Sequence, residues 1–438
     1  MMSHSANTTL TSDDDKNAIY KRITLRLIPF IFICYLFNYL DRVNVGFAKL
    51  QMLDALKFSE TVYGLGAGIF FIGYVLCGVP SNLALTRFGP RRWIAVMMIT
   101  WGVLSTCLMF VTTPTQFYGL RLLTGAAEAG FFPGVVLYLS QWFPTFRRGR
   151  IMALFMSAIP VSGLLGGPFS GWILSHFAAG QGGLAGWQWM FMLQGIPTVL
   201  LGGLAIFLLS DSFANAKWLS AHERAVLEAD HQLDAANRPS TATDSLLAVF
   251  KNPAIWAFGL IYFCIQSGVY AINFWLPSII KNLGFNDALV IGWISAIPYL
   301  LAAVFMLLVG RSADLRKERR WHLVVPMLMG AVGLIIAVNF ATQPAIAILG
   351  LTIATMGALT GLPMFWPVPT ALLSAGAAAG GLALINSMGQ MAGFLSPYLV
   401  GFVKDATGST DVALYMLAAV IVAGSLLALR MTRGMTNA

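Results

Sequence analysis

The chain has 438 residues, of which 58% are hydrophobic and only 10% are charged. Soluble domains carry about 25% charged residues, so this composition excludes a soluble globular protein and a disordered chain. The four cysteines have spacings that fit neither a disulfide framework nor a zinc site. The class that remains is a membrane protein that crosses the bilayer many times.

Long apolar stretches predict the number of membrane spans. A helix needs about 20 mostly apolar residues to cross the hydrocarbon core, and these stretches lack the alternation of a membrane β-strand. In chain order the stretches lie near residues 27–52, 62–85, 93–112, 117–140, 151–176, 187–209, 253–280, 288–310, 321–340, 344–371, 380–403 and 411–430. We therefore predict an all-α polytopic membrane protein with twelve transmembrane helices.

A long polar stretch, 211–252, divides the twelve spans into two groups of six. Ser220 and Glu223 within it form a capping-box pattern, which predicts a short amphipathic helix to about Leu233. The predicted organisation is a disordered cytoplasmic tail at 1–22, an N-terminal bundle at 23–210, a cytoplasmic linker at 211–252, a C-terminal bundle at 253–430 and a cytoplasmic tail at 431–438.

Basic residues predict the orientation. The termini and the even-numbered loops hold 21 of the 27 lysines and arginines, whereas the loops on the other side hold four, which are Lys49, Lys57, Lys281 and Lys404. Basic residues in short loops mark the cytoplasmic side, so both termini are predicted to be cytoplasmic. The net charge of +9 is then a topology signal and does not indicate nucleic-acid binding.

The two halves contain matching features. Leu56 to Gly64 recurs as Leu283 to Gly292 at offsets of 227 and 228, and Pro168 recurs as Pro397 at an offset of 229. Internal repeats with a site between them are the layout of secondary transporters. The repeat therefore predicts two pseudo-symmetric bundles of six helices.

Two loops resemble a motif of the major facilitator superfamily. The loop after span eight carries it in full, and the loop after span two has Asn82 and Thr86 where the motif has Gly and Asp. The resemblance implies the major facilitator fold and a gating role for both loops. The residues concerned are Arg87, Gly89 and Arg91 in the first loop and Gly310, Asp314, Arg319 and Arg320 in the second.

Two further segments, Tyr39 to Ala48 and Arg121 to Pro133, resemble the anion:cation symporter branch, and most of all the bacterial permeases for tartrate, phthalate and hydroxyphenylacetate. The resemblance implies import of a small organic carboxylate with a proton, by alternating access, across the bacterial inner membrane. It also implies roles in transport for the charged residues of these two segments.

Four charged side chains lie well inside the predicted spans: Asp41, Arg42, Arg121 and Glu128. Each costs roughly 2.5–3.5 kcal/mol at a helix centre on insertion scales, so we expect them to line a wet cavity and offset one another. An arginine keeps its charge, whereas a desolvated carboxylate can take a proton. We therefore predict that the arginines bind an anion and that Asp41 and Glu128 carry protons. The alternative is a static set of ion pairs between spans one and four.

In the empty site we expect both carboxylates to neutralise the arginines until an entering anion displaces them. Neutral residues complete the predicted site, with helix packing as the alternative role for each of them. They are Asn38, Tyr39 and Tyr74 in the first half and Gln266, Tyr270, Asn273, Trp366 and Asn386 in the second.

The predicted partners are a small organic carboxylate and membrane lipids, and we expect the protein to act as a monomer. Sodium-coupled transport, exchange, uniport and a non-transporting membrane sensor remain alternatives.

No nucleophile with a base and no set of metal ligands converges in the sequence, so we expect neither an enzyme nor a cofactor other than the proton. The substrate stays open between a dicarboxylate, such as tartrate or phthalate, and an aromatic acid.

Overall fold

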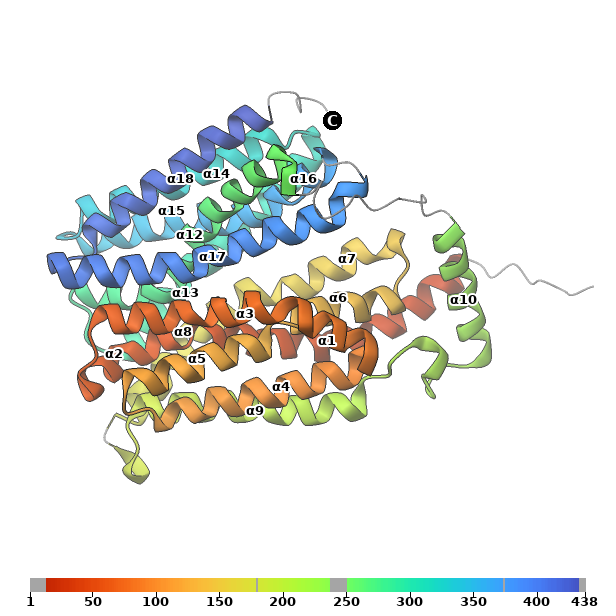
Figure 1. Cartoon of the computed structure of the whole chain (residues 1–438), viewed down its shortest axis with the longest axis horizontal. Helices are drawn as coiled ribbons and strands as arrows, with labels where there is room; N and C mark the ends of the chain where they lie inside the picture. Colours follow the sequence, from red (N-terminus) through yellow and green to blue (C-terminus); the bar gives the residue numbers. More distant parts are fainter. Residues whose placement is uncertain (1–12, 179, 237–249, 373–374, 433–438) are drawn as a thin grey trace, which may run out of the picture.

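The computed structural model describes residues 13–178, 180–236, 250–372 and 375–432. Within these ranges the regular structure is helical throughout, without a strand. Figure 1 shows two helical bundles that meet along one face, the first from red to yellow-green and the second from green to blue. The all-α prediction is confirmed.

The N-terminal bundle holds the first six spans. Its elements are α1 (Asp13–Val43), α2 (Val45–Leu56), α3 (Glu60–Phe88), α4 (Pro90–Cys107), η1 (Leu108–Phe110), α5 (Pro114–Glu128), α6 (Phe131–Trp142), α7 (Thr145–Met156), α8 (Ala158–His176), η2 (Gln181–Gly183) and α9 (Gly186–Leu208). Spans one, four and five each consist of two consecutive helices. Glu128 is the last residue of α5 and Arg42 is the last but one of α1, so these two charged residues lie at helix ends within their spans.

The linker and the C-terminal bundle follow. Their elements are η3 (Phe213–Asn215), α10 (Ala221–Ala236), α12 (Pro253–Asn282), α13 (Ala288–Arg316), α14 (Arg320–Asn339), α15 (Pro344–Phe365), α16 (Pro367–Leu372), α17 (Ala375–Thr407) and α18 (Asp411–Met431). Eleven of the predicted spans fall on helices of the described residues that are long and apolar enough to cross a membrane, and α17 covers the remaining one. The predicted amphipathic helix of the linker is α10.

Side chains at the helix starts explain several boundaries. The Ser59 hydroxyl accepts a hydrogen bond from the Val62 N–H at the start of α3, and the Asp287 carboxylate accepts one from Leu289 at the start of α13. Thr113 and Gln116 form a capping box at the start of α5. Such side chains satisfy backbone N–H groups that have no partner inside the helix.

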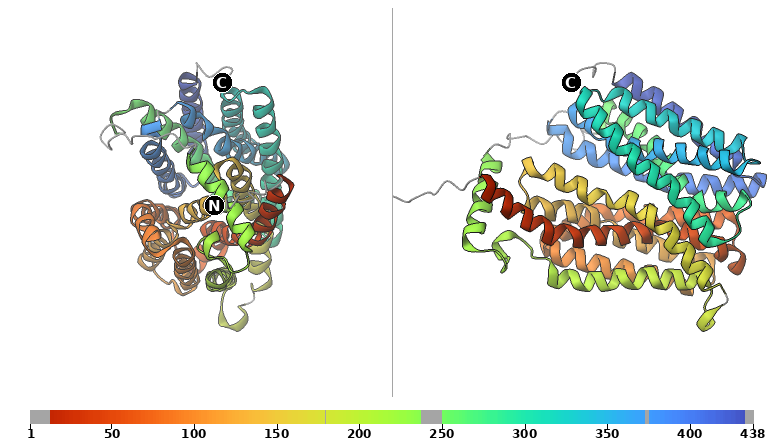
Figure 2. Two further views of the ribbon diagram at one scale, coloured as in Figure 1. Left: turned by 90° about the vertical axis from the view of Figure 1, so that its right-hand side faces the viewer. Right: turned by 180° about the vertical axis from the view of Figure 1, so that it is seen from behind.

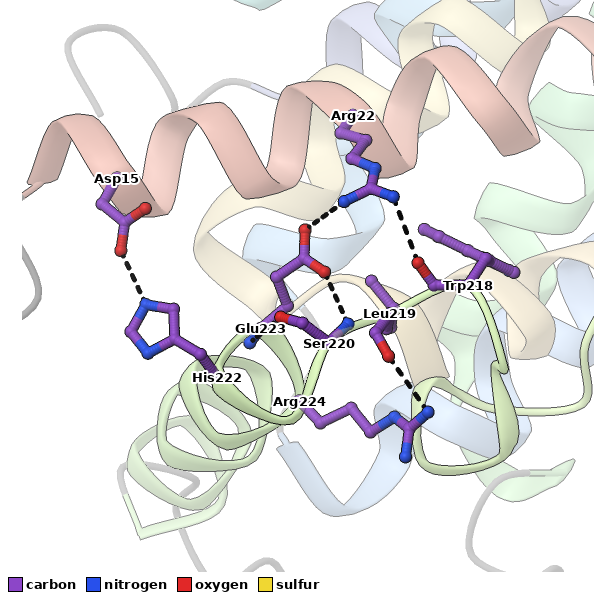
Figure 3. Close-up of polar contacts among 8 residues, drawn as sticks. All are labelled: Asp15, Arg22, Trp218, Leu219, Ser220, His222, Glu223 and Arg224. Carbon is purple, nitrogen blue, oxygen red and sulfur yellow. Dashed lines mark hydrogen bonds and ion pairs between the residues drawn. The ribbon is translucent and has the colours of Figure 1, made fainter.

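The N-terminus differs from its prediction. Helix α1 begins at Asp13, so residues 13–22 form its first turns and are not a tail, whereas residues 1–12 lie outside the described part of the chain. Three aspartates at its start favour a helix by opposing the helix dipole. Figure 3 shows the second cause, contacts between this segment and the linker: Arg22 pairs with Glu223 at 2.7 Å and Asp15 with His222 at 2.9 Å.

The predicted capping box at the start of α10 is present. The Ser220 N–H donates to the Glu223 carboxylate at 2.7 Å, and the Glu223 N–H donates to the Ser220 hydroxyl at 3.1 Å. Partial burial of the Glu223 carboxyl opposes its ionisation, but these hydrogen bonds and the Arg22 charge outweigh burial and lower its pKa. Glu223 therefore stays ionised and holds α10 against α1 at neutral pH.

The main contacts between the two bundles lie toward one end of the described spans. We call the ends beside α10 the linker side and the opposite ends the far side. Figures 1 and 2 show the bundles converging on the far side and diverging toward α10. The main contacts between them join α8 to α13, α3 to α17 and α2 to α12.

Glycines allow the closest of these contacts. A Cβ on Gly292 would lie 2.3 Å from the carbonyl of Gly167, and one on Gly64 would lie 2.4 Å from the carbonyl of Pro397. The repeat relates Gly64 to Gly292 and Pro168 to Pro397, and Gly292 also lies against Pro168. The repeat predicted from sequence is therefore present as two equivalent helix crossings on the far side.

Candidate functional site

Arg42 and Glu128 form a buried ion pair between α1 and α5. The Arg42 Nη2 and Nε donate to the same carboxylate oxygen, Glu128 Oε2, at 2.8 and 3.1 Å. The other oxygen, Glu128 Oε1, has no hydrogen-bond partner among the described residues. The Phe70 and Tyr74 rings flank the Arg42 guanidinium, with centroids 5.3 and 5.1 Å from its Cζ. Glu128 Oε1 can therefore accept a further hydrogen bond or a proton.

Arg121 is fully buried and contacts no carboxylate among the described residues. Its guanidinium donates to the backbone carbonyls of Gly66, Ala67 and Arg42 at 3.3 to 3.5 Å, and its Nη1 has no hydrogen-bond partner in the described part of the chain. The Phe70 ring lies near both arginines, with its centroid 4.8 Å from Arg121 Cζ and 5.3 Å from Arg42 Cζ. Backbone carbonyls, and not a carboxylate, are therefore the described hydrogen-bond partners of Arg121, and its neutralisation by a carboxylate in the empty site stays a prediction.

Asp41 also departs from its expected pairing. It is 1% exposed and accepts hydrogen bonds from Thr198 at 2.7 Å, Trp101 at 3.2 Å and Ser105 at 3.3 Å. Adjacent helical residues point about 100° apart, so α1 directs Arg42 toward α5 and Asp41 toward α4 and α9. Glu128 therefore pairs with Arg42 and not with Arg121, which leaves Arg121 without a carboxylate in contact with it among the described residues.

The second bundle contributes neutral contacts to the same region. Asn273 on α12 donates to the Tyr39 hydroxyl at 2.7 Å and accepts a hydrogen bond from Tyr299 at 2.6 Å. Tyr270 donates to the Gln390 side chain at 2.8 Å, and its ring lies 4.4 Å from that of Phe71. The structure thus brings Tyr39, Asn273 and Tyr270 together where the two bundles meet.

The remaining predicted site residues have varied surroundings. Gln266 donates to the Tyr262 hydroxyl at 3.3 Å, and the Tyr262 ring lies 4.9 Å from that of Trp366. Asn386 is half-buried on α17, and the Asn38 amide nitrogen is buried without a hydrogen-bond partner among the described residues. Their part in binding stays a prediction.

A charged cluster on the far side escaped the sequence analysis. Glu60 at the start of α3 pairs with Lys49 of α2 and with Lys404 of α17, both at 2.6 Å. Lys49 is only 5% exposed, and its Nζ lies 3.4 Å from the centroid of the Trp275 ring on α12. Their place at the ends of spans predicts outer-loop positions for Lys49 and Lys404. Both instead take part in the contact between the bundles, and so does Lys281, which donates to the Leu50 carbonyl at 3.2 Å.

Equivalent helix ends cap one another across the far side. The Asp405 carboxylate of α17 accepts hydrogen bonds from the Glu60 and Thr61 N–H groups at 3.1 and 2.7 Å. In the related crossing, the Ser175 hydroxyl of α8 accepts from the Leu289 N–H at 3.1 Å. Each bundle therefore satisfies free N–H groups at a helix start in the other.

Metal ligation has no support in the described residues, because they contain no group of three histidine, cysteine, aspartate or glutamate side chains that could hold an ion. The polar groups that converge instead are two arginines, one paired carboxylate, one separate carboxylate and neutral hydroxyls and amides. Such a set can bind an anion and hold protons.

Comparison with known proteins identifies the family. Residues 31–397 match the Major Facilitator Superfamily. The chain belongs to the major facilitator superfamily. The D-xylose-proton symporter has a similar structure, with a TM-score of 0.74 over 95% of this chain and 99% of that one, at 18% identity. This likeness confirms the predicted fold.

Relatives at higher identity have names that concern transport. A Pseudomonas putida protein named for metabolite transport, NicT, is 47% identical over 98% of each chain. An Agrobacterium vitis protein named for tartrate transport is 44% identical over 98% of this chain and 94% of that protein. This major facilitator protein is therefore a multi-pass membrane transporter of a small molecule and not an enzyme.

The two loops that carry the superfamily motif make their described contacts within their own bundles. Asp314 pairs with Arg319 at 2.6 Å, and Arg320 donates to the Leu429 carbonyl at 3.2 Å. Gly310 packs near Met364 of its own bundle. In the other loop, Gly89 has a φ of +83° and lies close to Asp211. Arg87 faces the Phe88 ring, and Arg91 is the second residue of α4. Their gating role stays a prediction.

Proposed function

We propose that this protein is a proton-coupled symporter of the anion:cation branch that imports a small organic carboxylate across the bacterial inner membrane. The observation that carries the proposal is the charge arrangement between α1 and α5. Of the two buried arginines, Arg42 pairs with Glu128 whereas Arg121 has no carboxylate in contact with it, and Arg121 Nη1 and Glu128 Oε1 have no hydrogen-bond partner among the described residues. A carboxylate substrate supplies the missing negative charge and accepts from both guanidinium groups.

Coupling follows from competition for Arg42. When the anion binds Arg42, Glu128 loses the two hydrogen bonds that stabilise its charge in a buried position, and a proton then replaces them. Anion and proton thereby favour each other's binding, which is the thermodynamic condition for symport. Glu128 is the proton site that responds directly to the substrate, and Asp41 is a second one held by neutral donors.

The linker side is assigned to the cytoplasm, with both termini there, because it carries most of the basic loop residues. Contacts between the bundles concentrate on the far side, so the described conformation is closed toward the outside. Alternating access then requires the far-side contacts to break and the linker-side ends to approach each other.

The substrate class is a carboxylate with polar or aromatic character. The tartrate-named relative favours a hydroxylated dicarboxylate. Tyr39, Tyr74 and Tyr270 around the arginines offer hydroxyls to such a molecule and also ring faces to an aromatic acid. Both kinds of substrate present the carboxylate that the arginines recognise.

The proposal is tested by uptake of labelled carboxylates into proteoliposomes that contain the purified protein. We expect an imposed pH gradient, acidic outside, to drive accumulation of tartrate or an aromatic acid, and an equal sodium gradient to have no effect. Accumulation driven by sodium alone, or equilibration without accumulation under the pH gradient, would contradict proton coupling.

Glu60→Gln is expected to open the far side. The change leaves Lys49 buried without its carboxylate, which destabilises the closed contact by about 1–3 kcal/mol once the partial exposure of Glu60 is allowed for. Spin labels at Thr112 and Ser409, in far-side loops of the two bundles, should then show a larger share of long distances. The exposed Asp54→Asn on α2 is the matched control. Identical distance distributions in Glu60→Gln and wild type would show that the cluster does not hold the bundles together.

A further inference from the structure

Asp41 lies in a site of its own, apart from the arginines. Side chains from α4 and α9 contact its carboxylate, and all of them are neutral: Trp101, Ser105 and Thr198. The charged groups that act on it are Arg121 and Glu128 of α5 and its neighbour Arg42 on α1. No described hydrogen bond or ion pair joins Asp41 to any of these three. An anion on the arginines therefore does not displace Asp41 from its partners.

The three donors differ in what they can do when Asp41 takes a proton. The Trp101 indole N–H only donates, so it cannot accept a hydrogen bond from the protonated carboxyl of Asp41. Hydroxyl groups both donate and accept, and Thr198 makes the shortest bond to Asp41, at 2.7 Å to Oδ2. Thr198 is fully buried, so its hydroxyl depends on protein groups for hydrogen bonds.

Thr198 has a second acceptor within reach. Its Oγ1 lies 3.2 Å from the backbone carbonyl of Gln194, one turn earlier on α9. With Asp41 ionised, the Thr198 hydrogen points to Asp41 Oδ2. With Asp41 protonated on Oδ2, the new O–H donates to Thr198 Oγ1, and the Thr198 hydrogen rotates to the Gln194 carbonyl. Thr198 thus has a hydrogen bond to Asp41 in both protonation states, and its buried hydroxyl is not left without a partner in either of them.

We propose that Thr198 is a positioning residue that allows Asp41 to gain and lose a proton inside the closed N-terminal bundle, at a proton site separate from the anion site. The inference rests on the proposed function for its role in transport, but the exchange of hydrogen bonds is a property of the protein alone. Ser105, at 3.3 Å and without a second described acceptor, cannot make the same exchange.

The experiment measures the protonation of Asp41 directly. The infrared band of its protonated carboxyl is identified in the purified protein as the band that Asp41→Asn removes, and its intensity is followed against pH. Thr198→Val removes the hydroxyl at nearly constant shape, and Thr198→Ser retains it. Thr106→Val is the matched control, because Thr106 lies on α4 against α9 and donates to its own helix at the Gly102 carbonyl.

We expect the midpoint of this titration to rise by about one pH unit in Thr198→Val, a tenfold change in proton affinity, because the charge-assisted bond to the ionised carboxylate is stronger than the bond from the protonated one, and its loss destabilises the ionised form more. Thr198→Ser and Thr106→Val should stay near the wild type. In proteoliposomes, Thr198→Val should lower pH-driven uptake about tenfold and leave anion exchange within about twofold. Unfolding temperatures of all variants check that they fold.

Two results would overturn the inference: an unchanged midpoint in Thr198→Val, or an equal loss of exchange and of pH-driven uptake in a folded protein. Failure of the proposed function has a different signature. In that case the wild type itself shows no pH-driven uptake, whereas the shifted midpoint in Thr198→Val still supports the exchange of hydrogen bonds at Asp41.

Discussion

Arg121→Lys is expected to reduce carboxylate uptake at least about a hundredfold. The Arg121 guanidinium already donates to three backbone carbonyls and still has Nη1 available for an anion. A lysine amine has three donors on a single atom and cannot satisfy carbonyls on α1 and α3 while it also binds a carboxylate. Loss of two charge-assisted hydrogen bonds, about 1.5–3 kcal/mol each, accounts for the size of the effect.

Calorimetric titration of the purified variant with the carboxylate, together with initial uptake rates, measures this loss. The control is Arg316→Lys at the exposed end of α13, which should bind and transport like the wild type. If Arg121→Lys folds and binds the anion with unchanged affinity, Arg121 only clamps α5 to α3, and the anion site lies elsewhere.

Glu128→Gln is expected to separate exchange from accumulation. The glutamine keeps the shape of the site and still accepts from Arg42, but it cannot take a proton. Exchange of labelled for unlabelled carboxylate should therefore stay within about threefold of the wild type, whereas accumulation driven by a pH gradient should fall at least about tenfold. Anion affinity should also lose most of its dependence on pH.

Counterflow and pH-driven uptake in the same proteoliposomes measure the two activities. The exposed Glu228→Gln on α10 changes the same functional group outside the bundle and should leave both activities intact. Equal loss of exchange and accumulation in Glu128→Gln would assign Glu128 to the static pairing of α1 with α5 and not to proton transfer.

The sequence predicts the architecture well because its signals are local. Apolar length marks each span, and the repeat of Gly64 and Pro168 as Gly292 and Pro397 marks the two crossings between the bundles. The start of α1 was misplaced because residues 13–22 are polar. Lys16 and Arg22 in this segment form ion pairs with a linker helix about 200 positions away, which no local pattern records.

The sequence identifies the charged residues inside the spans but not the side chains that they contact. The helical angle between Asp41 and Arg42 was available from the sequence, whereas the surroundings of each face depend on how α4, α5 and α9 pack. Ser105 and Thr198 carry no pattern that distinguishes them from other small polar residues in membrane helices. The burial of Lys49 has no local signal, because it arises from Glu60 of the next helix and from the Trp275 ring of the other bundle.

Proton movement caused by the anion itself is the most direct test of the central claim. Proteoliposomes that contain the wild-type protein, weakly buffered and without any imposed gradient, are loaded with a pH-sensitive dye and given the carboxylate outside. The account predicts that the lumen acidifies as the anion enters, with at least about one proton per anion, and that sodium does not change this ratio. Entry of the anion at an unchanged luminal pH would contradict it.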